Sequence, residues 1–153
     1  MNIAIGCDHT GHELKKAIID FLTCSGKNVV DLPASEGDEF PEIGERVAKE
    51  VVSGRADFGV IICGTGIGVS IAANKVPGAR AALCTDSFCA RMTRLHNDAN
   101  ILALGARVVG LDLAIDIVSN FFSTDFSNEE RHVRRIGKIS KLDEKLRNKN
   151  YKY

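Results

Sequence analysis

Hydrophobic residues fall along this chain in two alternating patterns, short continuous runs and longer amphipathic stretches. Short apolar runs without alternation are typical of strands that are covered on both faces, as in a parallel sheet. Five segments have this pattern, at residues 2–6, 28–32, 58–63, 80–84 and 100–104. We therefore expect five parallel strands.

The amphipathic stretches predict helices, because their apolar residues recur at helical spacing. These stripes cover residues 14–22, 43–51, 111–122 and 133–146, and a short helix is also expected over 69–74. Gly26 and Gly54 stand where the first two helices would end. Strands and helices that alternate in this way predict an α/β protein with a three-layer, Rossmann-like, doubly wound fold.

Charge and cysteine content narrow the class of protein. Among 153 residues, 20 Lys and Arg balance 20 Asp and Glu, so the composition requires neither nucleic acid nor a membrane as partner. The segment 131–153 is basic, with nine Lys or Arg against two acids, which fits a solvated helix face or an anion site. No apolar stretch suits a membrane span or a signal peptide. Five cysteines without a Cys-x-x-Cys pair indicate free thiols, a cytoplasmic protein and no structural metal.

Polar and reactive residues gather where the expected strands end. In a doubly wound sheet, ligands bind outside the carboxyl ends of the strands. Asp8 and His9 follow the first strand, the segment 63–68 ends the third, and Asp86 lies shortly after the fourth. Asp8 has a second interpretation, as a cap of the following helix, and so does Thr10.

The loop after the third strand carries Gly64, Gly66 and Gly68. A glycine-rich turn before a helix directs backbone N–H groups at an anion, although a tight turn without a ligand has the same composition. The loop lacks the Gly-Lys-Ser/Thr ending of a phosphate loop, and Val69 occupies the third glycine position of the dinucleotide fingerprint. Asp86, about twenty residues on, fits the ribose-binding acid of that fingerprint and keeps a dinucleotide-binding module as an alternative.

Cys63 allows two interpretations. A buried free cysteine behaves as a small hydrophobic residue, so its place at the end of an apolar strand is consistent with packing alone. The N-terminus of the helix expected just after it would instead stabilise a thiolate. The second interpretation makes Cys63 a reactive group beside the glycine loop.

Further candidates lie toward the C-terminus. His96 and Asn97 come shortly before the last strand, and Arg107 follows that strand. Arg131 and Arg135 are four residues apart and therefore share one helix face, where they can hold a phosphate from two sides. Such a pair is also common on a solvated face.

Four segments of this sequence resemble the type B ribose-5-phosphate isomerases, within the wider family that includes galactose-6-phosphate isomerase. The similar segments read "IGCDHTG", "ICGTGIGVSIAANKVPGARAAL", "HNDANILALGARVVG" and "RHVRRI", and together they span about residues 3–139. The resemblance implies an aldose–ketose isomerase that interconverts ribose 5-phosphate and ribulose 5-phosphate through an enediolate, without a cofactor or metal.

The resemblance also implies a role for each candidate residue. Cys63 would be the base, Thr65 and the amides of 64–68 would hold the enediolate oxygen, and His96 would help to open the furanose ring. The substrate-binding residues would be Asp8 and Asn97 at the sugar oxygens, and His9, Arg107, Arg131 and Arg135 at the phosphate.

The assembly that this resemblance implies is a homodimer with shared active sites, which leaves pairing into tetramers open. His96, Asn97 and Arg107 would come from the second subunit, toward which the C-terminal helix extends. We expect one sugar-phosphate isomerase domain over 1–147 and a frayed tail over 148–153.

One position departs from the family pattern. Similar proteins commonly have tyrosine before the proline of "DEFPE", whereas this chain has Phe40. The missing hydroxyl removes one hydrogen bond, worth about 1 kcal/mol. A six-carbon sugar phosphate, such as galactose 6-phosphate or allose 6-phosphate, is therefore an alternative substrate.

Overall fold

The computed structural model describes residues 1–147, in which the expected parallel sheet is present. Its strands are β1 (Asn2–Cys7), β2 (Asn28–Asp31), β3 (Phe58–Cys63), β4 (Ala81–Leu83) and β5 (Ile101–Gly105). They lie in the order β2-β1-β3-β5-β4, and every neighbouring pair is parallel. From β1 the chain winds outward to β2, and from β3 it winds in the other direction. The doubly wound prediction is confirmed.

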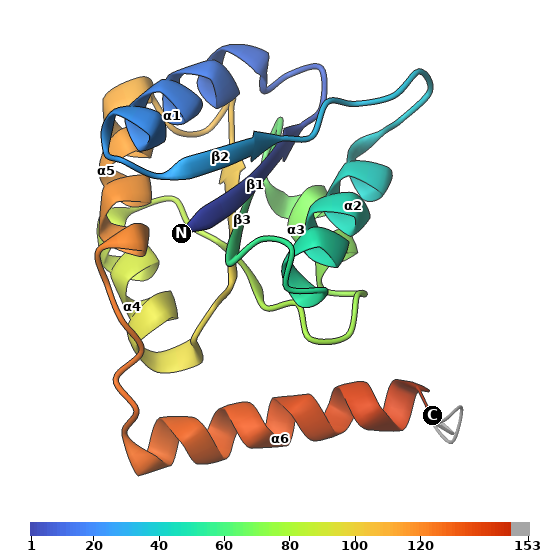
Figure 1. The fold of residues 1–153 in the computed structure, drawn as a ribbon, viewed down its shortest axis with the longest axis vertical. Coiled ribbons are helices and arrows are strands. Elements are labelled where there is room, and N and C mark those ends of the chain that lie inside the picture. Colours follow the sequence, from blue (N-terminus) through green and yellow to red (C-terminus); the bar gives the residue numbers. More distant parts are fainter. Residues whose placement is uncertain (148–153) are drawn as a thin grey trace.

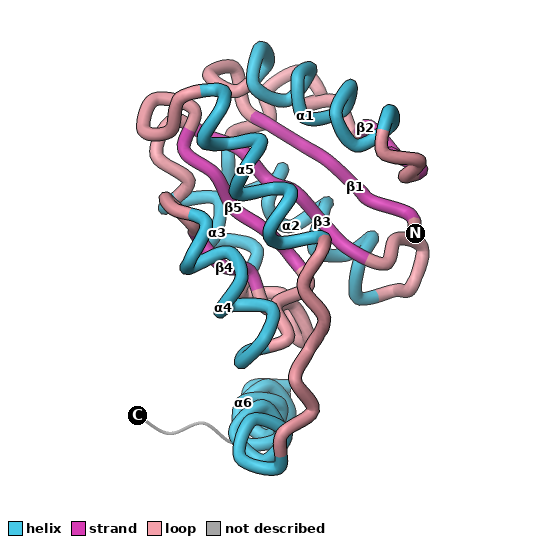
Figure 2. The backbone as a smooth tube through the Cα atoms, turned by 90° about the vertical axis from the view of Figure 1, so that its left-hand side faces the viewer, coloured by secondary structure: helices cyan, strands magenta, loops and turns pink. Residues whose placement is uncertain are grey.

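Helices cover both faces of this sheet. They are α1 (His12–Cys24), α2 (Phe40–Val52), α3 (Ile67–Ala73), α4 (Ser87–Asn97), α5 (Leu111–Phe122) and α6 (Glu130–Arg147). Helices α1, α4 and α5 lie on one face, and α2 and α3 lie on the other (Figures 1 and 2). Helix α6 stands apart from both layers, below the ends at which the strands begin (Figure 1).

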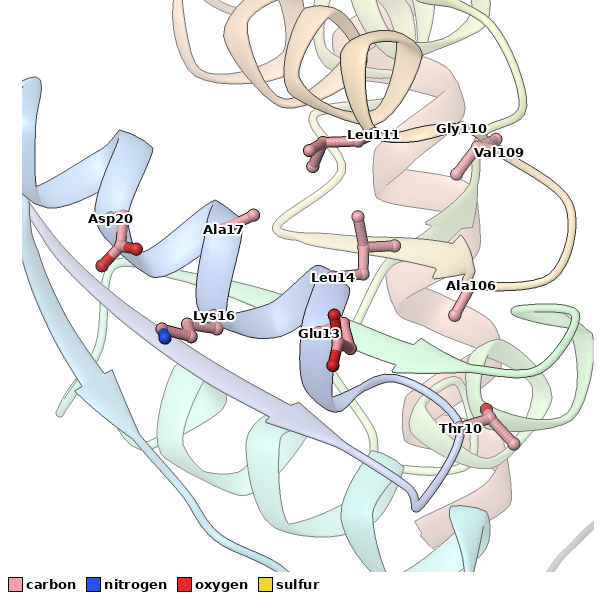
Figure 3. A pocket seen from close by; sticks show the side chains of 10 residues that line it. All are labelled: Thr10, Glu13, Leu14, Lys16, Ala17, Asp20, Ala106, Val109, Gly110 and Leu111. Atoms are coloured by element: carbon pink, nitrogen blue, oxygen red, sulfur yellow. The ribbon is translucent and has the colours of Figure 1, made fainter.

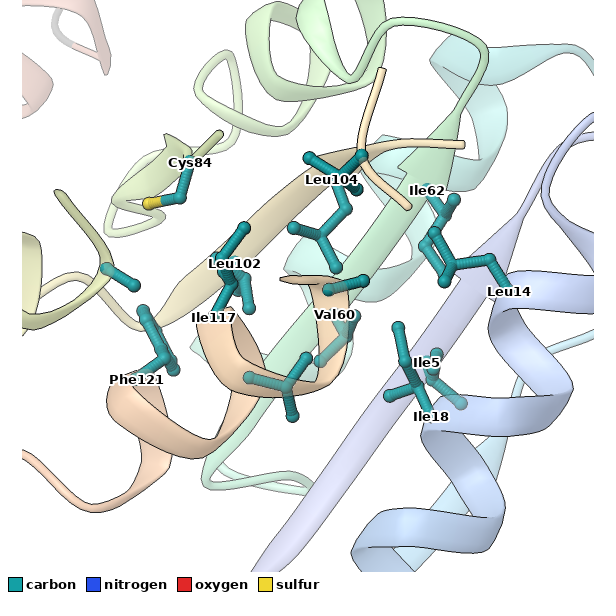
Figure 4. Close-up of a cluster of buried hydrophobic side chains, with 14 of the residues drawn as sticks. Ile5, Leu14, Ile18, Val60, Ile62, Cys84, Leu102, Leu104, Ile117 and Phe121 are labelled. Atoms are coloured by element: carbon teal, nitrogen blue, oxygen red, sulfur yellow. The ribbon is translucent and has the colours of Figure 1, made fainter. Parts of the chain in front are cut away.

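Two apolar clusters hold the layers together, because successive side chains of a strand point to opposite faces. In β3, Val60 and Ile62 pack against α1, α4 and α5 (Figure 4), whereas Ile61 and Cys63 pack against α2 and α3. Full burial of a side chain of this size stabilises the fold by about 1.5–3 kcal/mol. The strand that ends at the glycine loop is therefore fixed from both sides.

Most of the predicted helices agree with the structure, with two differences. Helix α3 begins at Ile67 rather than at residue 69, and α4 lies in a segment where no helix was predicted. Helix α4 buries Ala90 and Arg94 alone, so it has no apolar stripe for a sequence pattern to reveal. The prediction of a frayed tail concerns residues 148–153, which lie outside the described residues. Over residues 1–147, no helix is both long and apolar enough to cross a membrane.

Candidate active site

The carboxyl ends of β1 and β3 lie side by side at the point where the winding reverses. Cys7 is paired with Ile62, and the N–H of Asp8 donates to the carbonyl of Ile62 at 3.1 Å. Cys63 is paired with Gly105 at the end of β5. The polar residues after β1 and the glycine loop after β3 therefore share one edge of the sheet, where this fold places its ligands.

Cys63 is both a packed residue and a polar one. Its side chain is 5% exposed and belongs to the cluster between the sheet and α2 and α3. Its Sγ accepts the backbone N–H of Gly66 at 3.1 Å. Gly66 is the N-cap of α3 and has a φ of 75°, a left-handed conformation that glycine adopts without strain. The turn thus directs a backbone donor at the sulfur.

The same loop holds several N–H groups without an acceptor. The N–H of Ile67 contacts Thr65 Oγ1 at 3.3 Å, and the carbonyl of Gly64 accepts the backbone N–H of Arg107 at 3.0 Å. Within residues 1–147, the N–H groups of Gly64, Thr65 and Gly68 have no acceptor. Backbone donors arranged in this way form a concave site for a negatively charged oxygen.

Arg107 lies beside the glycine loop of its own chain. A Cβ placed on Gly64 would be 3.7 Å from Cδ of Arg107 and 3.7 Å from Oγ1 of Thr10. The chain therefore brings Arg107 to its own glycine loop, because the short turn after β5 runs directly along this loop; that a second subunit supplies Arg107 stays a prediction. Its guanidinium adds positive charge at the edge that carries Cys63.

Asp8 is held by the turn that follows β1. Its Oδ1 accepts the N–H of Thr10 at 2.9 Å and the hydroxyl of Thr10 at 2.5 Å. The N-cap of α1 is Gly11, which receives no side-chain cap, so the interpretation of Asp8 or Thr10 as a helix cap is wrong. Asp8 and the exposed His9 instead line a cleft of about 420 Å³.

Phe40 forms the opposite wall of that cleft. It is the first residue of α2 and is 40% exposed. Its ring lies on Gly68, where an added Cβ would be 2.8 Å from Cε2 of the ring. A side chain at this position would require the ring of Phe40 to shift. Phe40 therefore gives the cleft one apolar surface, beside the acidic Asp38 and Glu39.

A second cleft borders this edge, between α1 and the start of α5 (Figure 3). Its volume is about 490 Å³, and its lining includes Thr10, Glu13, Lys16, Ala106 and Leu111. None of the residues expected to bind substrate line it. It meets the glycine loop only through Thr10 and Ala106, which flank Asp8 and Arg107 in the chain.

His96 and Asn97 lie on the opposite side of the sheet from Cys63, near the end at which β5 begins. They end α4, which is stopped by Asp98 at a φ of 44° and by an ion pair from Asp98 to Arg94 at 2.8 Å. From here β5 runs to Gly105, the partner of Cys63, over about 13 Å of strand. One chain therefore does not bring His96 and Asn97 to its own Cys63.

Arg131 and Arg135 also lie away from the glycine loop. Both are exposed on α6, one turn apart as expected, and Arg131 forms an ion pair with Glu129 at 2.7 Å. Between them stands His132, a buried residue that the sequence did not single out. The chain thus carries two groups of candidate residues, one at the carboxyl ends of the strands and one on the side where the strands begin.

Asp86 has a structural role. Its carboxylate accepts the N–H of Cys89 at 2.8 Å and is the N-cap of α4. This bond removes the feature on which the dinucleotide-binding alternative depended. Over residues 1–147, no group of three His, Cys, Asp or Glu side chains is placed to hold a metal ion.

A doubly wound fold with a thiol and unpaired backbone amides at its switch point has the arrangement of an α/β enzyme. A family model described as Ribose/Galactose Isomerase matches residues 3–139. The chain belongs to the ribose/galactose isomerase family and is a sugar-phosphate isomerase.

Relatives of known name extend over most of the chain. Ribose-5-phosphate isomerase B of Escherichia coli is 42% identical, over 94% of this chain and 97% of its own length. The galactose-6-phosphate isomerase subunit LacB of Clostridium acetobutylicum is 38% identical, over 94% and 84%. The solved structure of Clostridium thermocellum ribose-5-phosphate isomerase B superposes with a TM-score of 0.92 at 54% identity, covering 95% of this chain and 99% of that one.

Proposed function

We propose that this chain interconverts ribose 5-phosphate and ribulose 5-phosphate, with Cys63 as the base. The observation that carries the proposal is the sulfur of Cys63, which accepts the N–H of Gly66 in a loop whose neighbouring amides are unpaired. The names of the Escherichia coli and Clostridium thermocellum relatives support the choice of substrate.

The reaction requires a base and an oxyanion site close together. A thiolate at Cys63 removes the proton from C2 of the open-chain aldose, and the electron pair moves toward the carbonyl oxygen O1 to give an enediolate. The amides of 64–68, with Thr65, hold that oxygen while it is negative. The thiol then returns its proton to C1, and the proton of the O2 hydroxyl moves to O1, which completes the ketose. One base serves both steps.

Substrate binding requires the second group of residues. Asp8, His9 and Arg107 stand at the edge that carries Cys63, whereas His96, Asn97, Arg131 and Arg135 stand at the other. We infer that a second copy of the chain brings its His96 and Asn97 to this sulfur, and that its α6 brings the two arginines to the phosphate. The active form is then a homodimer with shared sites.

A reducing cytoplasm suits this chemistry, because the base has to remain a free thiol. The structure contains five free cysteines, and burial raises the pKa of Cys84 to about 12. Cys84 therefore stays a neutral thiol.

The test is an isomerisation assay on ribose 5-phosphate, with EDTA present to remove divalent metals. Cys63→Ala should lower kcat by about a hundredfold or more while ribose 5-phosphate still binds, because only the base is lost. Cys84→Ala is the matched control, since it removes another buried thiol at the end of a strand, and its kcat should stay close to wild type. A Cys63→Ala enzyme with wild-type turnover would refute the assignment of the base.

Phe40 favours a second candidate, the same reaction on a six-carbon sugar phosphate. Its ring closes one wall of the cleft without a hydroxyl, and one relative is named as a galactose-6-phosphate isomerase subunit. The rates on ribose 5-phosphate, allose 6-phosphate and galactose 6-phosphate, measured with one preparation, distinguish the two. A higher kcat/KM on a six-carbon substrate would replace the first candidate.

A further inference from the structure

The end of α4 and the beginning of α6 are joined into one corner by Ser127. The backbone N–H of Ser127 donates to the carbonyl of Leu95 at 3.1 Å. The Oγ of Ser127 is 2.7 Å from Nδ1 of His132. These two bonds hold the first turn of α6 against the last turn of α4, which carries His96.

His132 is the buried residue of this corner. Its side chain is 2% exposed, whereas its neighbours Arg131 and Val133 are exposed. Its ring lies against the ring of His96, with centroids 4.4 Å apart and an angle of 44° between the planes. Burial of a polar ring costs free energy unless it is hydrogen-bonded, and Ser127 supplies that bond. The bond to Ser127 is made at the edge of the ring, and the ring also contacts His96.

Burial and the neighbouring charges disfavour the protonated form of the His132 ring. Burial and the neighbouring His96 hold the pKa of His132 below its ordinary value, and Arg131 and Arg135 act in the same direction. Glu129 acts in the opposite direction, with less effect than burial or His96. A neutral ring can pack against His96 whether or not His96 carries a proton, because no charge repulsion arises between them.

Opening of the furanose ring places a strict demand on the orientation of His96. The C1–O4 bond breaks, the proton of the O1 hydroxyl leaves as the carbonyl forms, and a proton reaches O4. An imidazole relays these protons only when its nitrogens are directed at the two oxygens. A free surface histidine samples several rotamers, so a contact that selects one of them increases the rate.

We propose that His132 is a positioning residue, whose ring, fixed by Ser127, sets the orientation of the His96 imidazole for ring opening. This inference rests on the proposed function, because it assigns His96 to that step. It also joins two parts of the site. The histidine that acts on the sugar ring and the arginines that hold the phosphate leave the same corner of the fold.

Two substitutions separate the ring contact from the hydrogen bond. His132→Phe keeps an aromatic ring against His96 but removes the nitrogen that meets Ser127. His132→Asn keeps a polar group for Ser127 but removes the ring. On ribose 5-phosphate we expect His132→Asn to lower kcat about tenfold or more with little change in KM, and His132→Phe to recover most of that loss.

The opposite results would overturn the proposal. If His132→Phe is the slower variant, His132 only anchors the corner. If KM rises while kcat is unchanged, the residue acts through the arginines. Wild-type kcat in both variants would show that His96 needs no support. Arg134→Gln is the matched control, because Arg134 is exposed in the same turn of α6, and it should behave as wild type.

NMR of the histidine ring protons tests the inference without turnover. Wild type should show a nuclear Overhauser effect between the rings of His96 and His132, and His132→Asn should show rotamer averaging at His96. Absence of the first, or an unchanged His96 signal in the variant, would refute the positioning role even if the variants fold poorly. A wild-type protein that shows the contact but does not isomerise ribose 5-phosphate would overturn the proposed function instead.

Discussion

Gly66 donates its backbone N–H to the sulfur of Cys63, and the conformation of Gly66 decides whether that hydrogen bond exists. Its N–H reaches Cys63 because φ is 75°. A Cβ at this position would lie 2.5 Å from Cδ1 of Leu83 and 2.8 Å from the backbone carbon of Leu104. Any side chain would therefore be strained twice, by the left-handed backbone and by contact with the neighbouring strands.

We expect Gly66→Ala to destabilise the fold by about 2 kcal/mol and to lower kcat, because relief of the strain moves the N–H away from the sulfur. Urea unfolding and the isomerase assay measure the two effects. Gly137→Ala is the control, since Gly137 lies in α6 with open space around it, and it should stabilise the helix by up to about 1 kcal/mol. Equal stability and activity for Gly66→Ala and wild type would contradict this account of the turn.

Helix α4 is stabilised by its N-cap residue more than by an apolar face. Asp86 caps it through the N–H of Cys89, and that bond holds the pKa of Asp86 below its ordinary value of 3.8. A carboxylate with a lowered pKa stabilises the fold above its ordinary pKa. The contribution is lost as the pH falls through the lowered value.

Asp86→Ala should lower Tm by roughly 3 °C at pH 7, because the cap is lost. The difference from wild type should shrink in acid, as Asp86 of the wild type becomes protonated. Asp86→Asn should retain most of the stability, since asparagine also caps helices. Thermal unfolding measures all three, and a large loss of activity without loss of stability would instead indicate a ligand contact at Asp86.

The elements differ in how well the sequence predicted them, for a physical reason. The strands and most helices bury apolar residues at regular spacing, so their pattern was visible. Helix α4 instead buries Arg94, whose guanidinium carbon Cζ lies 4.7 Å from the centroid of the Phe58 ring. The glycine loop was also predictable, because its parts are contiguous. The contact between His96 and His132 was not, since it depends on a corner formed by three separate segments.

The whole molecule presents one group of candidate residues at the carboxyl ends of its strands and one on the side where the strands begin. Helix α6 lies outside the two helix layers. Along α6, Val133, Ile139 and Leu142 are between 41% and 50% exposed. Helix α6 contacts its own domain at a few points, at His132 and at Asp143, which accepts the N–H of Gly78 at 2.9 Å. Apolar side chains that stay exposed on such a helix are typical of a surface covered by another chain. This arrangement agrees with the proposed homodimer, in which each chain completes the site of the other.

Mixing two inactive variants tests that assembly. Cys63→Ala and His96→Gln chains, unfolded together and refolded, should recover up to about a quarter of wild-type activity, because half of random dimers are mixed and one of their two sites is intact. Cys63→Ala mixed with Gly66→Ala should recover nothing beyond the residual activity of each, since both changes affect the same edge. No recovery in the first mixture would contradict shared sites.

In the proposed homodimer, the separation of the thiol from His96 has an evolutionary consequence. After gene duplication, one copy could lose its thiol and the other its imidazole, and a pair of unlike chains would still form one working centre. Selection would then preserve both genes, because neither product is active by itself. A fold of this kind is therefore predisposed to give rise to obligate two-component enzymes from a single ancestor.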